Sequence, residues 1–117
     1  MNEEMIQPTE GLAFFRRGRN LDEMKTVQLR RTLICADGFH LSVQAHRGAW
    51  AEPSDDKGPW RVVEVATKDQ VIGWDRFLDH DVAVAGTTGW RFFYAHVPLI
   101  VVETFAVAHG GIIGERG

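Results

Sequence analysis

The sequence predicts an α+β fold: a small antiparallel sheet of about four strands, a C-terminal helix packed on one face, and a short helical or irregular N-terminal extension. Three observations support this prediction. Asp37-Gly38 stands between two strand-like runs, two further runs rich in β-branched or aromatic residues follow at 61–66 and 90–96, and the apolar stretch 98–109 ends on glycines. Strands followed by one long helical pattern are typical of an α+β layer.

The length and composition fit one globular domain. Of 117 residues, 44% are hydrophobic and 25% are charged, and the formal charge of −3 disfavours a general nucleic-acid binder, which is usually basic. No apolar run reaches the roughly 20 residues that a membrane span needs. A single cysteine excludes an internal disulfide framework and fits a reducing compartment. We therefore expect a cytoplasmic protein that does not enter a membrane.

The first 24 residues differ from the rest and are expected to form an extension to a single α+β domain at 25–117. This segment is polar and lacks the hydrophobic core of a secretion signal. A short helical turn is expected at 12–15, with Thr9 as its cap and Gly18 as its stop. The segment also carries a basic cluster made of Arg16, Arg17 and Arg19.

The hairpin around Asp37-Gly38 is predicted with a two-residue turn. This register places Cys35 opposite His40. The apolar face of the hairpin then carries Ala36, Ile34, Thr32, Phe39, Leu41, Val43 and Ala45. The polar face carries Cys35, Leu33, Arg31, His40, Ser42, Gln44 and His46. The strand at 30–36 is expected to lie at an edge of the sheet, which leaves a monomer and a symmetric homodimer both open.

Beyond the hairpin we expect a loop, a strand, a helical turn, a short strand, a glycine-flanked turn and a fourth strand, at 47–59, 61–66, 72–78, 82–85, 86–89 and 90–96. The helix at 98–109 is supported at both ends, because Pro98 suits a first helical position and Gly110-Gly111 stops a helix. Its β-branched interior weakens the prediction. This helix is expected to cover the apolar face of the sheet.

No metal site is expected. His40 and His46 share a predicted strand face, but they lie roughly 20 Å apart along it and cannot hold one ion. His80 with Asp79 and Asp81 is a better local candidate, because imidazole and carboxylate both bind divalent metals. Adjacent side chains seldom point at one centre, however, so a solvated acidic loop is the favoured interpretation.

No catalytic site is expected either. Cys35 and His40 would face each other across the hairpin, which is the arrangement that activates a nucleophilic thiolate. The sequence offers this pair no third orienting group and no oxyanion donor, so a structural cysteine is favoured. We therefore expect a non-enzymatic protein without a cofactor.

The segment 51–81 is acidic and bordered by tryptophans. It carries eight Asp and Glu against four Lys and Arg. An ordinary solvated face is one interpretation; the other is a surface that attracts a basic partner, with tryptophan as its anchor. Trp60 and Trp90 adjoin strands and are expected in the core. The predicted partner-binding residues are Trp50, Glu52, Asp55, Asp56, Trp74, Asp75, Asp79 and Asp81.

Three stretches of the chain carry a resemblance: TLICADGFHLSVQAH at 32–46, VVEV at 62–65, and VPLIVVE with a later AHGG at 97–111. With these stretches the chain resembles a group of small proteins encoded by phages and prophages. Those proteins share an ADGF hairpin, an SVQA strand, a VEV strand and a VP…VVE…HGG ending. The resemblance covers about 32–111, and its motifs are structural rather than catalytic. The acidic loop after SVQA and the first 24 residues depart from it.

The resemblance implies an inhibitor of bacterial defence, because phage accessory proteins of this size often have that role. An anti-CRISPR-like protein would bind a host effector complex stoichiometrically in the bacterial cytoplasm. Its carboxylates would act as a nucleic-acid mimic and block the surface where that complex binds nucleic acid. The alternative is a protein that sequesters a nucleotide signal, through the basic N-terminal residues or through the polar hairpin residues Arg31, His40 and Gln44.

Overall fold

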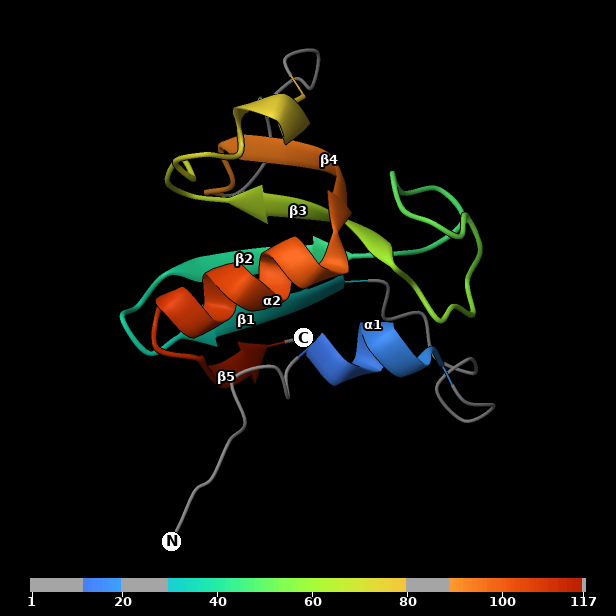
Figure 1. Ribbon diagram of the computed structural model, residues 1–117, viewed down its shortest axis with the longest axis horizontal. Helices are drawn as coiled ribbons and strands as arrows, with labels where there is room; N and C mark the ends of the chain where they lie inside the picture. Colours follow the sequence, from blue (N-terminus) through green and yellow to red (C-terminus); the bar gives the residue numbers. More distant parts are fainter. Residues whose placement is uncertain (1–11, 20–29, 80–88, 117) are drawn as a thin grey trace, which may run out of the picture.

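The computed structural model describes residues 12–19, 30–79 and 89–116 (Figure 1). The predicted cap Thr9, the predicted domain boundary after residue 24, the predicted strand at 82–85 and most of the predicted turn at 86–89 lie outside these ranges. Within them, no helix has the length and apolar character to cross a membrane.

The predicted α+β class is confirmed. The described residues form an antiparallel sheet of five strands in the order β4-β3-β2-β1-β5 (Figure 1). The strands are β1 (Arg30–Cys35), β2 (His40–Gln44), β3 (Val62–Thr67), β4 (Phe92–Pro98) and β5 (Ile112–Arg116). The helices are α1 (Ala13–Arg17), the 3-10 turn η3 (Asp75–Phe77) and α2 (Leu99–Ala108). Both α1 and α2 lie on the same side of the sheet.

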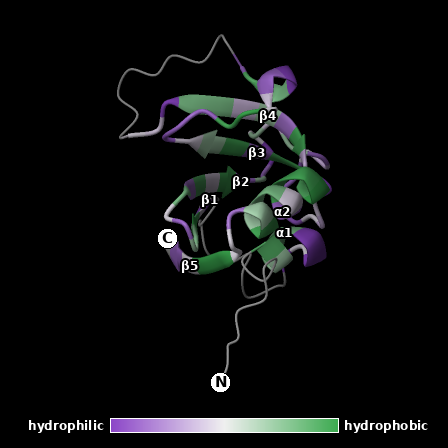
Figure 2. Ribbon diagram, turned by 60° about the vertical axis from the view of Figure 1, so that its left-hand side comes forward, coloured by the Kyte–Doolittle hydropathy of each residue, from purple (hydrophilic) through white to green (hydrophobic). Residues whose placement is uncertain are grey.

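The core lies between the sheet and α2, as predicted. The sheet contributes the fully buried side chains of Leu33, Cys35, Leu41, Val43, Val63, Val65 and Val97. The helix contributes Leu99, Val102 and Ala106. Figure 2 shows α2 mainly in the hydrophobic colour. Its apolar residues are not confined to the buried side, because Ile100 and Val107 are exposed. The β-branched residues of α2 have low helix propensity, so burial of its apolar face against the sheet is what stabilises the helix.

The predicted hairpin register is wrong by one residue. Leu33 pairs with Leu41, and Ile34 pairs with His40. The loop has three residues instead of two, because Gly38 adopts φ +92° and its N–H donates to the Cys35 carbonyl. A left-handed third residue is typical of three-residue hairpin loops. The shift turns Leu33 and Cys35 into the core and moves Ile34 to the opposite face.

The strand β5 was not predicted, and its position corrects the expected sheet edge. β5 pairs antiparallel with β1, with Leu33 opposite Glu115 and Cys35 opposite Ile112. β1 is therefore an interior strand, and a homodimer formed by pairing at 30–36 loses its structural basis. The Gly110-Gly111 stop explains the new strand: Gly111 donates its N–H to the Ala106 carbonyl and closes the helix, after which the chain turns back beside β1.

The remaining elements agree with the sequence within two residues. β3 has Val63 and Val65 buried on one face, as the alternation of apolar residues in 61–66 predicts, and it extends to the buried Thr67. Helical structure within 72–78 is confirmed as η3, and β4 begins at Phe92 rather than at 90. Pro98 is the N-cap of α2 and not its first helical residue.

The short helix α1 is part of the core. Leu12 and Phe15 are fully buried, and the Trp60 N–H donates to the Phe15 carbonyl at 2.8 Å. Gly18 ends the helix with φ +81°, and a Cβ there would lie 2.9 Å from the Lys57 carbonyl oxygen. A five-residue helix does not persist alone in water, so these contacts keep α1 in place.

The three-residue hairpin loop is testable by substitution at Gly38. A Cβ added there meets nothing within 4 Å, so Gly38→Ala changes only the backbone preference. We expect Gly38→Ala to lower the free energy of unfolding by roughly 1–2 kcal/mol, because alanine disfavours positive φ. Gly48→Ala is the matched control, with an expected change within about 0.5 kcal/mol. Urea denaturation measures both, and equal effects would contradict the observed loop.

Candidate functional site

The eight predicted partner-binding residues fall into separate segments. One group lies in the loop between β2 and β3 and contains Trp50, Glu52, Asp55 and Asp56. The other lies in the segment around η3 and contains Trp74, Asp75 and Asp79. Asp81 lies outside the described residues, as does His80 of the predicted metal candidate.

The pairing along β4 sets these two groups apart. Glu52 forms an isolated bridge with Val62, which in turn pairs with Pro98 at the end of β4. Asp79 donates its N–H to the carbonyl of Phe93, five residues earlier in the same strand. Five residues of strand span about 15 Å. The acidic segment therefore does not form one continuous cluster of carboxylates.

Trp74 is not a surface anchor. Its side chain is 6% exposed and packs edge-on against Tyr94, with ring centroids 5.2 Å apart. The surface interpretation of Trp74 is therefore wrong, because the segment 71–77 folds back over the core and places the indole against it. Trp60 is buried as predicted, whereas Trp90 is half-buried beside Lys68.

Asp55 and Asp56 shape the loop in which they lie. Asp55 Oδ1 accepts the N–H groups of Lys57 at 3.0 Å and Gly58 at 2.8 Å. Asp56 Oδ1 accepts the N–H of Arg47 at 2.8 Å, and this hydrogen bond holds the pKa of Asp56 below its usual value, assisted by the Arg47 charge. Both carboxylates thus have a folding role that the sequence did not reveal.

Trp50 has an exposed side chain, and its backbone forms two hydrogen bonds with neighbouring strands. Its N–H donates to Glu64 Oε1 at 3.0 Å, and its carbonyl accepts the N–H of His96 at 3.2 Å. The indole itself is 41% exposed. Glu64 Oε2 also accepts an N–H from Gln44 at 2.7 Å, so a carboxylate anchored to β2 and β3 fixes the position of Trp50.

His96, whose N–H donates to the Trp50 carbonyl, has an unusual backbone conformation. Of the non-glycine residues that the structure describes, His96 alone has a positive φ, which is 54°. It lies in an irregularity of the β3–β4 ladder, between the Val63–Val97 and Val65–Tyr94 pairs. Its exposed ring has Nδ1 3.9 Å from Glu52 Oε2. We call Trp50, Glu52 and His96 the Trp50 surface.

Strain of this kind occurs preferentially where function requires it. A non-glycine residue in the left-handed region costs of order 1–3 kcal/mol and persists only where its surroundings impose it. At His96 the result is a backbone N–H that points at the Trp50 carbonyl. The conformation of β4 is therefore coupled to the presentation of an exposed tryptophan.

The predicted Cys35–His40 pair does not form. His40 lies opposite Ile34, on the other face from Cys35, because of the register shift. Burial, with a smaller effect of Asp37, raises the pKa of the Cys35 thiol to about 11, so the thiol stays protonated at neutral pH. Within the described ranges, no three His, Cys, Asp or Glu side chains lie close enough to hold a metal ion.

The polar hairpin residues proposed for a nucleotide are also divided. Arg31 lies on the α1 side of the sheet, with its guanidinium 4.1 Å from the centre of the Phe14 ring. His40 and Gln44 lie on the opposite face, because the three-residue loop reversed the faces of β1. Arg31, His40 and Gln44 therefore do not meet around one ligand.

No protein-family model, curated protein or solved structure matches this chain. The candidate site is therefore defined only by the positions and contacts of the described residues. Sequence reasoning found Trp50 and Glu52 through their residue types, but it missed Glu64 and His96. Glu64 is one of the eight Asp and Glu residues in 51–81 and has no distinguishing pattern around it, and no sequence signal marks the irregularity in β4 at His96.

The hydrogen bond from the Arg47 N–H to the Asp56 carboxylate predicts a lowered pKa for Asp56. A lowered pKa means that the ionised carboxylate stabilises the fold above its unfolded pKa of about 3.9, and that this contribution is lost as the pH falls through the folded value. We expect the carboxyl carbon of Asp56, followed by NMR, to titrate with a midpoint below pH 3.8. Arg47→Gln should raise this midpoint without restoring 3.8, because the backbone hydrogen bond remains. A wild-type midpoint at or above 3.8 would contradict the contact.

Proposed function

We propose that this protein is a non-enzymatic binding protein that associates stoichiometrically with a partner protein through the Trp50 surface. The observation that carries the proposal is that Trp50 has an exposed indole while its backbone is fixed by two hydrogen bonds. Its N–H donates to Glu64, and its carbonyl accepts the N–H of His96. An unconstrained loop would present the same side chain at a larger entropic cost. Holding the backbone in advance lowers that cost when a partner binds.

Tryptophan is well suited to this role. Its side chain buries a large apolar area and retains one hydrogen-bond donor, which explains its enrichment among residues that dominate interface energies. Glu52 follows Trp50 by two residues, and the backbone N–H of His96 donates to the Trp50 carbonyl, so an exposed carboxylate and an exposed imidazole lie 3.9 Å apart in the same region. An apolar anchor within a polar rim is the usual organisation of a protein interface.

The expected partner is a bacterial defence complex, with a CRISPR effector as the first candidate. This part of the proposal rests on the resemblance to phage-encoded proteins and on the exposed carboxylate of Glu52 in the Trp50 surface. Lys and Arg side chains that normally bind nucleic-acid phosphates would pair with Glu52 while Trp50 anchors beside them. Inhibition would follow because the protein and the nucleic acid compete for the same surface.

We expect Trp50→Ala to weaken binding to a purified CRISPR effector complex by about 30-fold or more, which corresponds to about 2 kcal/mol. Ile72→Ala is the matched control, because Ile72 is 96% exposed but lies in the segment preceding η3. Biolayer interferometry gives the dissociation constants, and competition with labelled target DNA reports inhibition. Thermal denaturation should show both variants folded, since neither side chain belongs to the core.

Two results would count against the proposal. One is an effect of Trp50→Ala no larger than that of Ile72→Ala on a complex that the wild type binds. The other is binding of a cyclic nucleotide by calorimetry with no effector complex bound, which would favour the sequestering alternative. Asp55 and Asp56 are unsuitable for this test, because their replacement would disturb the loop that carries Trp50.

A further inference from the structure

A series of hydrogen bonds connects Trp50 to the histidine at the start of its loop. Glu64 Oε1 accepts the Trp50 N–H at 3.0 Å, and Glu64 Oε2 accepts an N–H from Gln44 at 2.7 Å. The other side-chain atom of Gln44, Oε1, lies 3.1 Å from His46 Nε2. The N–H of Gly48 donates to His46 Nδ1 at 3.0 Å. His46 therefore contacts both the support of Trp50 and the turn that precedes it.

These contacts determine the protonation state of His46. An ionised carboxylate only accepts hydrogen bonds, so Gln44 turns its amide NH2 to Glu64 and its Oε1 to the imidazole. His46 Nε2 must then carry a proton. A backbone N–H only donates, so Nδ1, which faces Gly48, must carry none. The hydrogen bonds around the ring thus assign the neutral imidazole with its proton on Nε2.

Protonation of His46 would break one of these two contacts. A proton on Nδ1 would point at the Gly48 N–H, so that two donors would face each other. The hydrogen bond from Nε2 to Gln44 would survive, because an imidazolium still donates there. The disturbance is therefore confined to the turn at 46–49, in which the Ala49 N–H also donates to the His46 carbonyl at 3.1 Å. Trp50 is the next residue along the chain.

Charged groups on three elements surround His46. The hydrogen bond from Arg47 lowers the pKa of Asp56 most, and the charges of Arg47, His46 and Arg19 lower it further, so Asp56 attracts an imidazolium at His46. Arg47 and Arg19 carry positive charge beside the same carboxylate and oppose a further cation. Glu64 on β3 adds a negative charge behind the intervening amide. These charges alter how readily His46 takes up a proton, but they do not change the donor that Nδ1 faces.

We propose that His46 is a pH switch for the loop that presents Trp50. The neutral ring holds the turn at 46–49, and protonation releases this turn while the strands stay paired. A histidine side chain ordinarily has a pKa of about 6.5, so a moderate fall in pH acts on it. Because the fold selects the neutral ring, the contribution of the Gly48 hydrogen bond is present at neutral pH and declines on acidification.

The effect on partner binding rests on the function proposed for the Trp50 surface. A loosened turn raises the entropic cost of presenting the indole to a partner. One hydrogen bond of this kind corresponds to a factor of about two to ten in affinity. We expect binding of the effector complex to weaken by that factor between about pH 7.5 and about pH 5.5.

Amide hydrogen exchange of the isotope-labelled full chain, followed by NMR at these two pH values, tests the switch without a partner. We expect the protection factors of Gly48, Ala49 and Trp50 to fall at least about threefold at the lower pH. At the higher pH, the nitrogen shifts of the His46 ring should show a protonated Nε2 and a bare Nδ1. Unchanged protection, or a proton on Nδ1 at the higher pH, would overturn the proposal.

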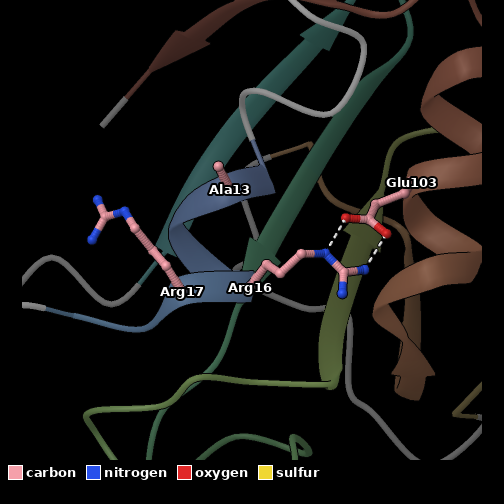
Figure 3. Close-up of a pocket in the computed structure, with 4 residues that line it drawn as sticks. All are labelled: Ala13, Arg16, Arg17 and Glu103. Carbon is pink, nitrogen blue, oxygen red and sulfur yellow. Dashed lines mark hydrogen bonds and ion pairs between the residues drawn. The ribbon is translucent and has the colours of Figure 1, made fainter.

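The helix α2 provides an internal reference for this experiment. Figure 3 shows Arg16 reaching from α1 to Glu103 of α2, and Arg16 Nε donates to Glu103 Oε2 at 2.9 Å. This hydrogen bond raises the pKa of Arg16, and arginine and glutamate ordinarily titrate outside the interval used. The amides of α2 should therefore keep their protection at both pH values. An equal loss in α2 would overturn the switch, because acid would then loosen the domain as a whole.

Variants identify the histidine that responds to pH. An asparagine side chain accepts the N–H two residues later, so His46→Asn can keep the contact with Gly48 but cannot titrate in this interval. We expect its protection at 48–50 to be the same at both pH values. His96→Asn is the matched control, because it removes the other histidine near Trp50 and asparagine tolerates positive φ. Persistence of the pH effect in His46→Asn, or its loss in His96→Asn, would overturn the assignment to His46.

Binding of the effector complex provides a separate readout. Affinity that falls with pH in the wild type but not in His46→Asn would support the switch as a regulator of the Trp50 surface. An equal fall in both proteins would overturn that regulation. Absence of binding at both pH values would contradict the proposed function of the Trp50 surface, and the amide protection would still decide whether His46 controls the loop.

Discussion

The packing of Trp60 is the contact that joins α1 to the loop between β2 and β3. Its indole is 1% exposed, stacks on Phe14 and meets Phe15 edge-on, with centroids 5.9 and 6.1 Å away. Its backbone N–H donates to the Phe15 carbonyl, and its indole N–H donates to the Asp55 carbonyl at 3.2 Å. One side chain thus joins α1 to the loop that carries Trp50. Without it, α1 and the part of the loop around Asp55 lose the contact that joins them.

Trp50 and the exposed apolar residues of α2 are supported in different ways by the fold. The Trp50 surface relies on polar contacts across strands, since Glu64 and His96 hold the backbone while the indole stays exposed. The helix α2 is largely apolar but is covered on one side only, so that Ile100 and Val107 remain exposed to solvent.

Much of the fold followed from the sequence, and the failures have two causes. Alternation of apolar residues predicted β3, and the Pro98 and Gly110-Gly111 signals predicted α2, because those patterns depend on neighbours in the chain. The hairpin register failed because Asp37-Gly38 is compatible with both loop lengths. The burial of Trp74, the strand β5 and the strain at His96 depend on contacts between distant segments, which local patterns do not encode.

Hydrogen exchange of a Trp60→Leu variant, followed by mass spectrometry, tests the central claim most directly. If Trp60 joins α1 to the loop, amides in 12–19 and in 46–58 should lose protection together, while those of β2 and β3 keep theirs. Loss confined to the loop would contradict the account, because α1 would then be held independently. Uniform loss that includes β2 and β3 would also contradict it, because Trp60 would then support the whole sheet and not this junction.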